Sequence, residues 1–310
     1  MRPCLLSRWI PALAVLLLAA AAPAYDQPAV NLGFTSFLDG IPPAGPGWYA
    51  AQYLQYYTAD ELPDLPFPGQ PELEAWISLS QVIYQSPKTL PTGASLGLDV
   101  ILPVALFDLD ADGTPLTAND GLGDLLIGPY LQWAPVMGKN GPVFVHRLEL
   151  QTIVPTGDYD EDRNINPGAN VVSLNPYWAA TWFLTPKWTL SGRFHYLWNA
   201  KNTDPFSPPE SGIRNTQAGQ ALHANFATEC EVIAQKLRLG INGYAFRQIT
   251  ASQTNGADNH GKKEQVFALG PGALWSFNPN NHLFVNVYFE MDAQSRPEGE
   301  RGSIRYVHHF

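Results

Sequence analysis

The stretch LFVNVYFEM at residues 283–291 decides the fold, because its side chains alternate in character with a period of two. Every odd-numbered position in it is apolar, whereas Asn286, Tyr288 and Glu290 lie between them. Successive side chains of a β-strand point to opposite faces, so one face of this segment meets an apolar surround and the other meets water. The pattern predicts a strand in a two-faced sheet.

The same alternation recurs from about residue 48 to the C-terminus. Leu96 begins an apolar file that ends at Leu106, with Asp99 on the opposite face. The pattern predicts an all-β, antiparallel barrel of about 12 strands (range about 10–14), each at least roughly 9–11 residues long, as a tilted membrane strand requires. The predicted spans are 47–57, 73–86, 92–107, 121–134, 142–155, 169–184, 187–200, 216–231, 235–249, 263–277, 281–292 and 301–310.

The connections between these spans alternate in length. Five are short, at 86–91, 135–141, 185–187, 232–235 and 278–280. Five longer polar ones separate them, at 58–72, 108–120, 156–168, 201–215 and 250–262. Short periplasmic turns and long extracellular loops are typical of an outer-membrane barrel with both termini in the periplasm, whereas a soluble β-sandwich has no reason to sort its loops.

Both chain ends fit export to the outer membrane. Residues 1–24 resemble a cleaved signal peptide, with Arg2 and Arg8 before a short apolar run and small residues at Ala22 and Ala24. The C-terminal strand carries Ile304, Tyr306 and Phe310 on one face, which resembles the barrel-insertion signal, although His308 interrupts that face. Cell outer membrane is therefore the expected location, with the barrel-insertion machinery, membrane lipid and lipopolysaccharide as partners.

Net charge and cysteine content limit the possible partners and cross-links of the protein. Loss of the two signal-peptide arginines takes the formal charge from −10 to −12, which argues against a nucleic-acid partner. The mature chain keeps a single cysteine, Cys230, so it has no internal disulfide. Residues 47–310 form the expected barrel domain. Residues 25–46 precede it, and the sequence leaves open whether they form a flexible periplasmic tail or fold into the barrel as a plug.

Several longer motifs resemble a known family of outer-membrane proteins, that of the meta-pathway of phenol degradation. The motifs are GLGD at 121–124, GPYLQW at 128–133, PTGDYD at 155–160, NPG at 166–168, NPYWA at 175–179, YLWN at 196–199, QAGQ at 217–220, GPG at 270–272, NVYFE at 286–290 and RPEG at 296–299. The resemblance implies a transporter-like barrel for hydrophobic or aromatic compounds. It brings no catalytic residues with it.

Charged residues on the polar phase of the strands are expected to face the lumen, because a charge facing lipid costs roughly 2–4 kcal/mol near the midplane. With one tyrosine chosen by type, the predicted lumen wall, and candidate substrate path, is Asp99, Asp124, Arg147, Glu149, Arg193, His195, Glu229, Glu231, Arg238, Tyr244, Glu264, Glu290 and Arg305. Trp133, Tyr177 and Trp198 are further candidates for aromatic contacts along that path, although tryptophans also form interface girdles.

No motif for catalysis or firm metal binding is present. Asp108, Asp110 and Asp112 resemble the start of a calcium loop, but Asn119 occupies the position of the bidentate glutamate. A solvated acidic loop tip is the favoured interpretation, with weak Ca²⁺ binding as a hypothesis and no other cofactor expected. The G-x-S-x-G elbow of a serine hydrolase is missing, so the chain is not expected to be an enzyme.

The leading functional prediction is therefore an outer-membrane channel for passive uptake of small hydrophobic or aromatic compounds. The alternative is a structural or adhesive barrel with a filled lumen and no transport role. A lipid hydrolase is disfavoured by the missing nucleophile motif.

Overall fold

The computed structural model describes residues 27–42, 44–61, 71–111, 113, 116–208, 211–259, 261 and 263–310. Within that part of the chain, no helix is long and apolar enough to cross a membrane. The expected signal peptide, residues 1–24, lies outside the described residues.

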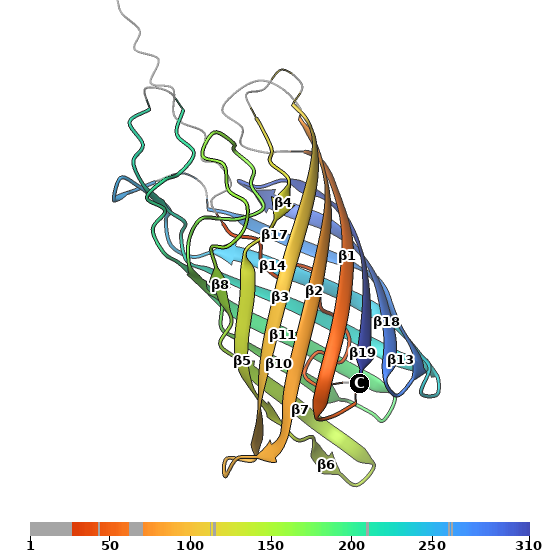
Figure 1. Ribbon diagram of the computed structural model, residues 1–310. Helices are drawn as coiled ribbons and strands as arrows, with labels where there is room; N and C mark the ends of the chain where they lie inside the picture. The colour runs from red at the N-terminus through yellow and green to blue at the C-terminus, as the bar shows by residue number, and fades with distance from the viewer. Residues whose placement is uncertain are drawn as a thin grey trace, which may run out of the picture.

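Twelve antiparallel strands close into a barrel (Figure 1). Strand β1 (Gly47–Glu61) pairs with β2 (Glu72–Thr89) on one side and with the last strand, β19 (Glu298–His309), on the other, which closes the ring. The other unbroken strands are β3 (Ala94–Asp110), β11 (Trp188–Asn199), β13 (Ala221–Ile233), β14 (Leu237–Gln248), β17 (Gln265–Asn278) and β18 (Asn281–Gln294).

Three neighbouring barrel strands are each broken into two segments. They are β4 (Gly121–Leu122) with β5 (Leu125–Trp133), β7 (Gly141–Glu149) with β8 (Thr152–Val154), and β9 (Ser173–Leu174) with β10 (Tyr177–Phe183). Pro176 lies at one break, where it has no N–H to donate to a neighbouring strand. Its carbonyl still accepts from the Tyr196 N–H at 3.1 Å, so the wall stays hydrogen-bonded across the break.

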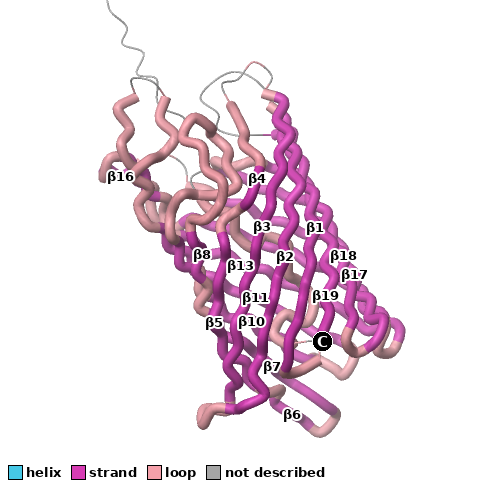
Figure 2. Tube along the Cα trace, viewed as in Figure 1, coloured by secondary structure: helices cyan, strands magenta, loops and turns pink. Residues whose placement is uncertain are grey.

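The short connections lie at one end of the barrel and the long connections lie at the other end (Figure 2). The short-turn end carries residues 90–93, 184–187, 234–236 and 279–280, and β6 (Val136–Gly138) extends the hairpin into β7 there. The long-loop end carries the long polar connections. In outer-membrane barrels the short-turn end faces the periplasm.

Twelve strands occupy the twelve predicted positions, but the spans 121–134, 142–155 and 169–184 are broken rather than continuous, and three further details of the prediction are wrong. Thr216–Gln217 is a separate short strand, β12, which pairs with β15 (Gln253–Thr254) in a small loop sheet completed by β16 (Ala257–Asp258). Asp108 and Asp110 belong to β3, because its hairpin with β2 continues beyond the membrane-length span. The last connection is only residues 295–297, because β18 and β19 also extend upward.

The outer face of the wall is apolar and the inner face polar, as the alternation predicts. Leu96 and Leu106 on β3 are 51% and 52% exposed, whereas Asp99 between them is 2% exposed. Because apolar side chains carry the exposed positions along the strands, the outer surface suits lipid.

Residues 27–42, called the N-terminal segment below, lie inside the barrel and run from the long-loop end to the short-turn end (Figure 1). Near the start of β13, Gln27 Nε2 donates to the Gly219 carbonyl at 2.8 Å. Lower down, the Gly40 N–H donates to Thr181 Oγ1 at 3.0 Å, and the Gly40 carbonyl accepts from Gln132 Nε2 at 3.0 Å. Of the two arrangements that the sequence left open, the described residues adopt the one inside the lumen.

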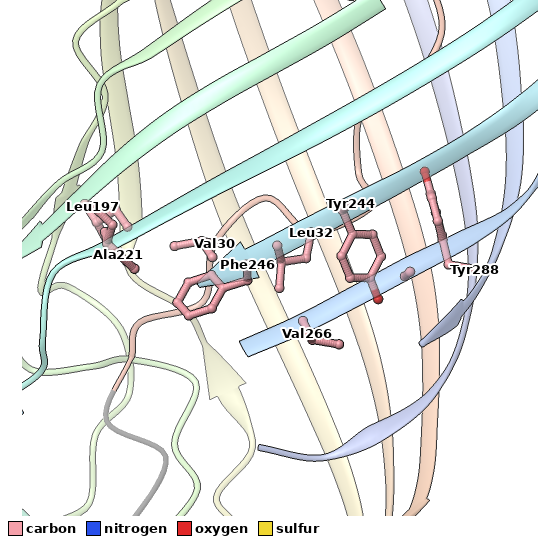
Figure 3. Packing of buried hydrophobic residues seen from close by; sticks show 10 residues of the cluster. Val30, Leu32, Leu197, Ala221, Tyr244, Phe246, Val266 and Tyr288 are labelled. Carbon is pink, nitrogen blue, oxygen red and sulfur yellow. The ribbon is translucent and has the colours of Figure 1, made fainter. Parts of the chain in front are cut away.

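The upper part of this segment packs into an apolar cluster in the long-loop half of the barrel (Figure 3). Val30 and Leu32 lie among Tyr244, Phe246 and Val266 of the wall. Leu32 is 3% exposed and Phe246 is 2% exposed. At about 25 cal/mol per Å² of apolar surface, this burial stabilises the segment in its position inside the barrel.

Candidate functional site

The inward-facing surface of the strands, here called the lumen wall, buries most of the residues predicted to line it. Those less than a tenth exposed are Asp99, Asp124, Arg147, Glu149, Arg193, His195, Glu229, Tyr244, Glu264, Glu290 and Arg305. Glu231 and Arg238 are half-buried near the short-turn end. The structure thus brings most of these residues into one interior, but they form several separate groups within it.

One group joins the wall to the N-terminal segment. Arg193 on β11 donates through Nε and Nη2 to both carboxylate oxygens of Asp39, each at 2.7 Å. Its guanidinium also lies 4.1 Å from the centre of the Tyr177 ring. Sequence reasoning missed Asp39, because the segment that carries it has no strand alternation from which a facing direction can be read.

A second group surrounds Glu290 on β18. Its carboxylate accepts hydrogen bonds from Tyr244 at 2.6 Å and from Tyr57 at 2.9 Å, and it pairs with Arg301 at 3.2 Å. Arg301 stacks over the Tyr57 ring at 4.1 Å. Arg301 was not predicted, although its spacing of four residues from Arg305 on the same strand places both on one face.

Two further groups are held by polar contacts within the wall. Arg238 pairs with Glu231 at 3.1 Å and with Glu229 at 3.6 Å. Asp99 accepts from Gln81 Nε2 at 2.8 and 2.9 Å. These carboxylates are therefore occupied by neighbours on adjacent strands.

Glu149 and the buried histidines make up another part of the wall. The Tyr177 hydroxyl donates to Glu149. His195 stacks on His223 with ring centres 4.1 Å apart, and His223 Nε2 lies 3.0 Å from Asn175 Oδ1. The two histidines form a stacked pair within the wall. No group of three metal-ligating side chains occurs in the described ranges.

Two predicted wall residues support loops at the long-loop end. Asp124 lies at the break between β4 and β5, where its carboxylate accepts from the N–H groups of Gly157 at 3.0 Å and Ala169 at 2.8 Å. Glu264 precedes β17, and its carbonyl accepts from the Gln248 N–H at 2.8 Å. Both residues therefore hold the rim of the barrel.

A cavity of about 260 Å³ lies in the short-turn half of the lumen, beside the lower part of the N-terminal segment. Arg147 and Arg305 line it, together with Arg193 and Tyr53. Phe37 of the segment and Phe284 of β18 supply aromatic surface to the same cavity. Among the residues predicted from sequence, the cavity brings together four arginines and one carboxylate, namely Arg147, Arg193, Arg238, Arg305 and Glu231.

The aromatic candidates divide between the two faces. Tyr177 and Tyr244 are 2% and 0% exposed and face inward. Trp133 and Trp198 are half-buried on the outward phase of their strands, so the expectation that they line the path is wrong. Their neighbours in the alternation, Gln132 and Asn199, take the inward positions instead.

The remaining predicted residues lie away from the lumen. Ile304, Tyr306 and Phe310 are exposed on the outer face of the last strand, at 47%, 40% and 73%. Asp108 and Asp110 are exposed on β3, and Asp112 is outside the described residues. Weak calcium binding there stays a hypothesis.

A closed twelve-stranded barrel with an apolar outside, a polar inside and loops sorted by length defines an outer-membrane-type β-barrel. The chain belongs to the family described as "Putative MetA-pathway of phenol degradation", whose model matches residues 56–306. This match confirms the resemblance seen in the sequence motifs. No curated protein matches the chain in sequence.

Several solved structures are similar to this chain. The COG4313 outer membrane channel from Pseudomonas putida F1 overlaps with a TM-score of 0.74 at 18% identity, covering 91% of this chain and 100% of that one. The β domain of the Bordetella autotransporter BrkA has a TM-score of 0.48 at 11% identity, covering 86% and 100%. The CymD monoaromatic hydrocarbon channel has a TM-score of 0.44 at 8% identity, covering 87% and 91%.

Proposed function

We propose that this barrel is a channel for the passive uptake of small hydrophobic or aromatic compounds across the outer membrane. The observation that carries the proposal is the cavity of about 260 Å³ at the short-turn end. Pockets that hold drug-sized ligands measure roughly 300–1,000 Å³, so this one suits a molecule with a single ring. Its aromatic and apolar lining favours such a molecule over a sugar.

The N-terminal segment determines the path that a solute would take through the barrel. It passes along the interior and packs apolar side chains into the long-loop half. A solute entering from the loops therefore has to pass beside Val30 and Leu32 or displace them. Because these contacts are apolar, a hydrophobic solute can replace them at a lower cost than a polar one.

Uptake by cells tests the proposal. A strain without this protein is compared with its parent and with a complemented strain, using radiolabelled phenol, toluene and benzoate at low concentration and glucose as the control solute. Slower uptake of the aromatic compounds, with unchanged glucose uptake and recovery on complementation, is the expected result. Equal aromatic uptake in all three strains would refute a channel role.

A second candidate is a structural or adhesive barrel with a filled lumen. The hydrogen bonds that tie Gln27 and Gly40 to the wall favour it, because they fix the segment across the interior. Planar-bilayer recording of the full-length mature protein separates the two candidates. A steady conductance excludes the filled barrel, whereas a silent, correctly folded barrel supports it.

A further inference from the structure

The cavity at the short-turn end carries an excess of positive side chains. Its lining includes the cationic residues Arg147, Arg193, Arg305, Lys236 and Arg238, and the anionic residues Asp39 and Glu231. Lys236 is exposed in a turn at the mouth of the cavity. The others lie on the strands or on the N-terminal segment.

Both acidic residues are already paired. Asp39 accepts the two bonds from Arg193 at 2.7 Å. Glu231 pairs with Arg238 at 3.1 Å. Within the described part of the chain, neither Arg147 nor Arg305 has a carboxylate oxygen within the 4.0 Å of an ion pair. Two buried guanidinium groups therefore face the cavity without a counter-charge in contact.

Of these two arginines, Arg305 has the greater need of an anion. It is only 8% exposed, and its Nε, which is fully buried, has no hydrogen-bond partner. Its guanidinium carbon lies over Phe284, 3.6 Å from the ring centre. A buried cation with an unused donor is costly, and an anion that accepts from that donor removes the cost.

Arg147 brings positive charge from another part of the wall. It is 7% exposed, its Nε donates to Gln132 at 3.0 Å, and its guanidinium lies 4.2 Å from the Tyr130 ring centre. Its strand, β7, is reached from β19 through β1, β2, β3 and β5, nearly halfway around the ring. The cavity is thus positive on nearly opposite walls, which favours an anion between them.

The rest of the lining argues for an organic anion. Phe37, Leu274, Phe284 and Val307 belong to one apolar cluster and also line this cavity. A hydrated inorganic anion gains nothing from such a surface, whereas a ring buries apolar area against it. The volume allows a single ring with a small substituent.

We propose that this cavity binds a small aromatic monocarboxylate, with its carboxylate on the Arg305 guanidinium and its ring against Phe37 and Leu274. The site names the substrate class of the proposed channel, and in that sense it rests on the proposed function. Arg147 adds attraction from the facing wall and disfavours neutral analogues.

Calorimetry on the full-length mature protein in detergent tests the site directly. The probes are benzoate, its neutral counterpart benzamide, and acetate, which has the charge but no ring. Benzoate is expected to bind at least about tenfold more tightly than either of the others, because a charge-assisted bond and ring burial each contribute about that factor. Equal binding of benzoate and acetate indicates a simple anion site and overturns the proposal, as does equal binding of benzoate and benzamide.

Arg305→Gln should weaken benzoate binding about tenfold or more, and Arg305→Lys should restore part of the loss. Arg247→Gln is the matched control, because Arg247 is exposed at the long-loop end. Heat-modifiable migration on gels shows that each variant is folded. If Arg305→Gln does not fold, Arg147→Gln takes its place. Unchanged benzoate affinity in the folded variant overturns the assignment.

The two levels of the proposal fail separately. Selective benzoate binding in detergent without faster aromatic uptake by cells leaves the site standing and removes the channel. Aromatic uptake by cells without selective benzoate binding leaves the channel standing and removes the site.

Discussion

Apolar packing and hydrogen bonds hold the N-terminal segment in both halves of the lumen, but only the short-turn half leaves a cavity beside it. In the long-loop half, Val30 and Leu32 pack into an apolar cluster. In the short-turn half, Asp39 and Gly40 are held by directional bonds to Arg193, Thr181 and Gln132, and a cavity remains beside them. Apolar packing fills space without fixing direction, whereas hydrogen bonds and ion pairs fix position without filling it. The upper half is therefore a seal, and the lower half is a framework around an open site.

Removing the segment should erase the difference between the halves, and it has the largest expected effect. Excision of residues 27–40 removes both the apolar filling and the bonds to Arg193. A severalfold rise in single-channel conductance is expected, because the interior then holds only wall side chains. The barrel should still show heat-modifiable migration, since its strands pair with one another. Unchanged conductance in a folded barrel would show that the segment does not limit passage.

Breaking the ion pair should loosen the lower half alone. Asp39→Asn leaves Arg193 buried without its counter-charge, and loss of one partner of a buried pair costs about 3–5 kcal/mol. Brief openings are expected in bilayer recordings, because the penalty falls on the position of the segment.

The double variant Asp39→Asn with Arg193→Gln serves as the control. It removes the stranded charge, so its openings should be fewer than those of the single variant. Equal flicker in the two variants would mean that the ion pair does not hold the segment.

Weakening the apolar seal should change conductance without changing charge preference. Leu32→Ala removes a side chain that is 3% exposed, at a cost of about 2–5 kcal/mol for a core truncation. Conductance should rise modestly while the reversal potential in a salt gradient stays constant, because the arginines that line the cavity lie in the other half. Leu98→Ala, on the outer face at 44% exposed, is the matched control and should change neither quantity. A shifted reversal potential in Leu32→Ala would show that the long-loop half also affects charge preference.

The smallest effect is expected outside the lumen, in the long loops. A hydrogen bond with Asp204, together with its charge, raises the pKa of the Glu161 carboxyl. A raised folded-state pKa means stability that is present at low pH and is lost as pH rises through that value, because the ionised pair repels.

Glu161→Gln removes this repulsion, so its melting temperature should exceed that of the parent by less than about a degree at pH 7 and should equal it near pH 4. A difference of several degrees, or a change in conductance, would show that the loops take part in closing the lumen.

The sequence predicts the wall well because its information is local. The side chains of each strand alternate between its two faces. The nearest neighbours of Asp99 and Arg305 in the sequence are therefore enough to place these two residues inward. The structure shows that Trp133 and Trp198 lie on the outward phase of their strands, next to the buried Gln132 and Asn199. Residue type alone does not distinguish a tryptophan of the lumen from one of the interface girdle.

What the sequence could not predict depends on contacts between distant segments. Asp39 contacts Arg193 across 154 residues of chain, and no pattern in the sequence near either residue predicts this contact. The end of β3 at Asp108 and Asp110 resembles a loop in the sequence, because polar side chains continue the hairpin beyond the membrane-length span. The cavity arises where wall residues and the N-terminal segment leave space between them, and a local sequence pattern does not predict such a space.

Closure of the ring also constrains the order of assembly. Strand β19 is the last to be synthesised and pairs with β1, the first, and the Phe310 N–H donates to the Trp48 carbonyl at 3.0 Å across that seam. The N-terminal segment joins β1 directly, yet its partners Arg193 and Asn225 lie on strands from the middle of the chain. A growing sheet can receive the segment on its concave side while the seam is open, with no need for threading. Sealing the seam is then the step that traps it.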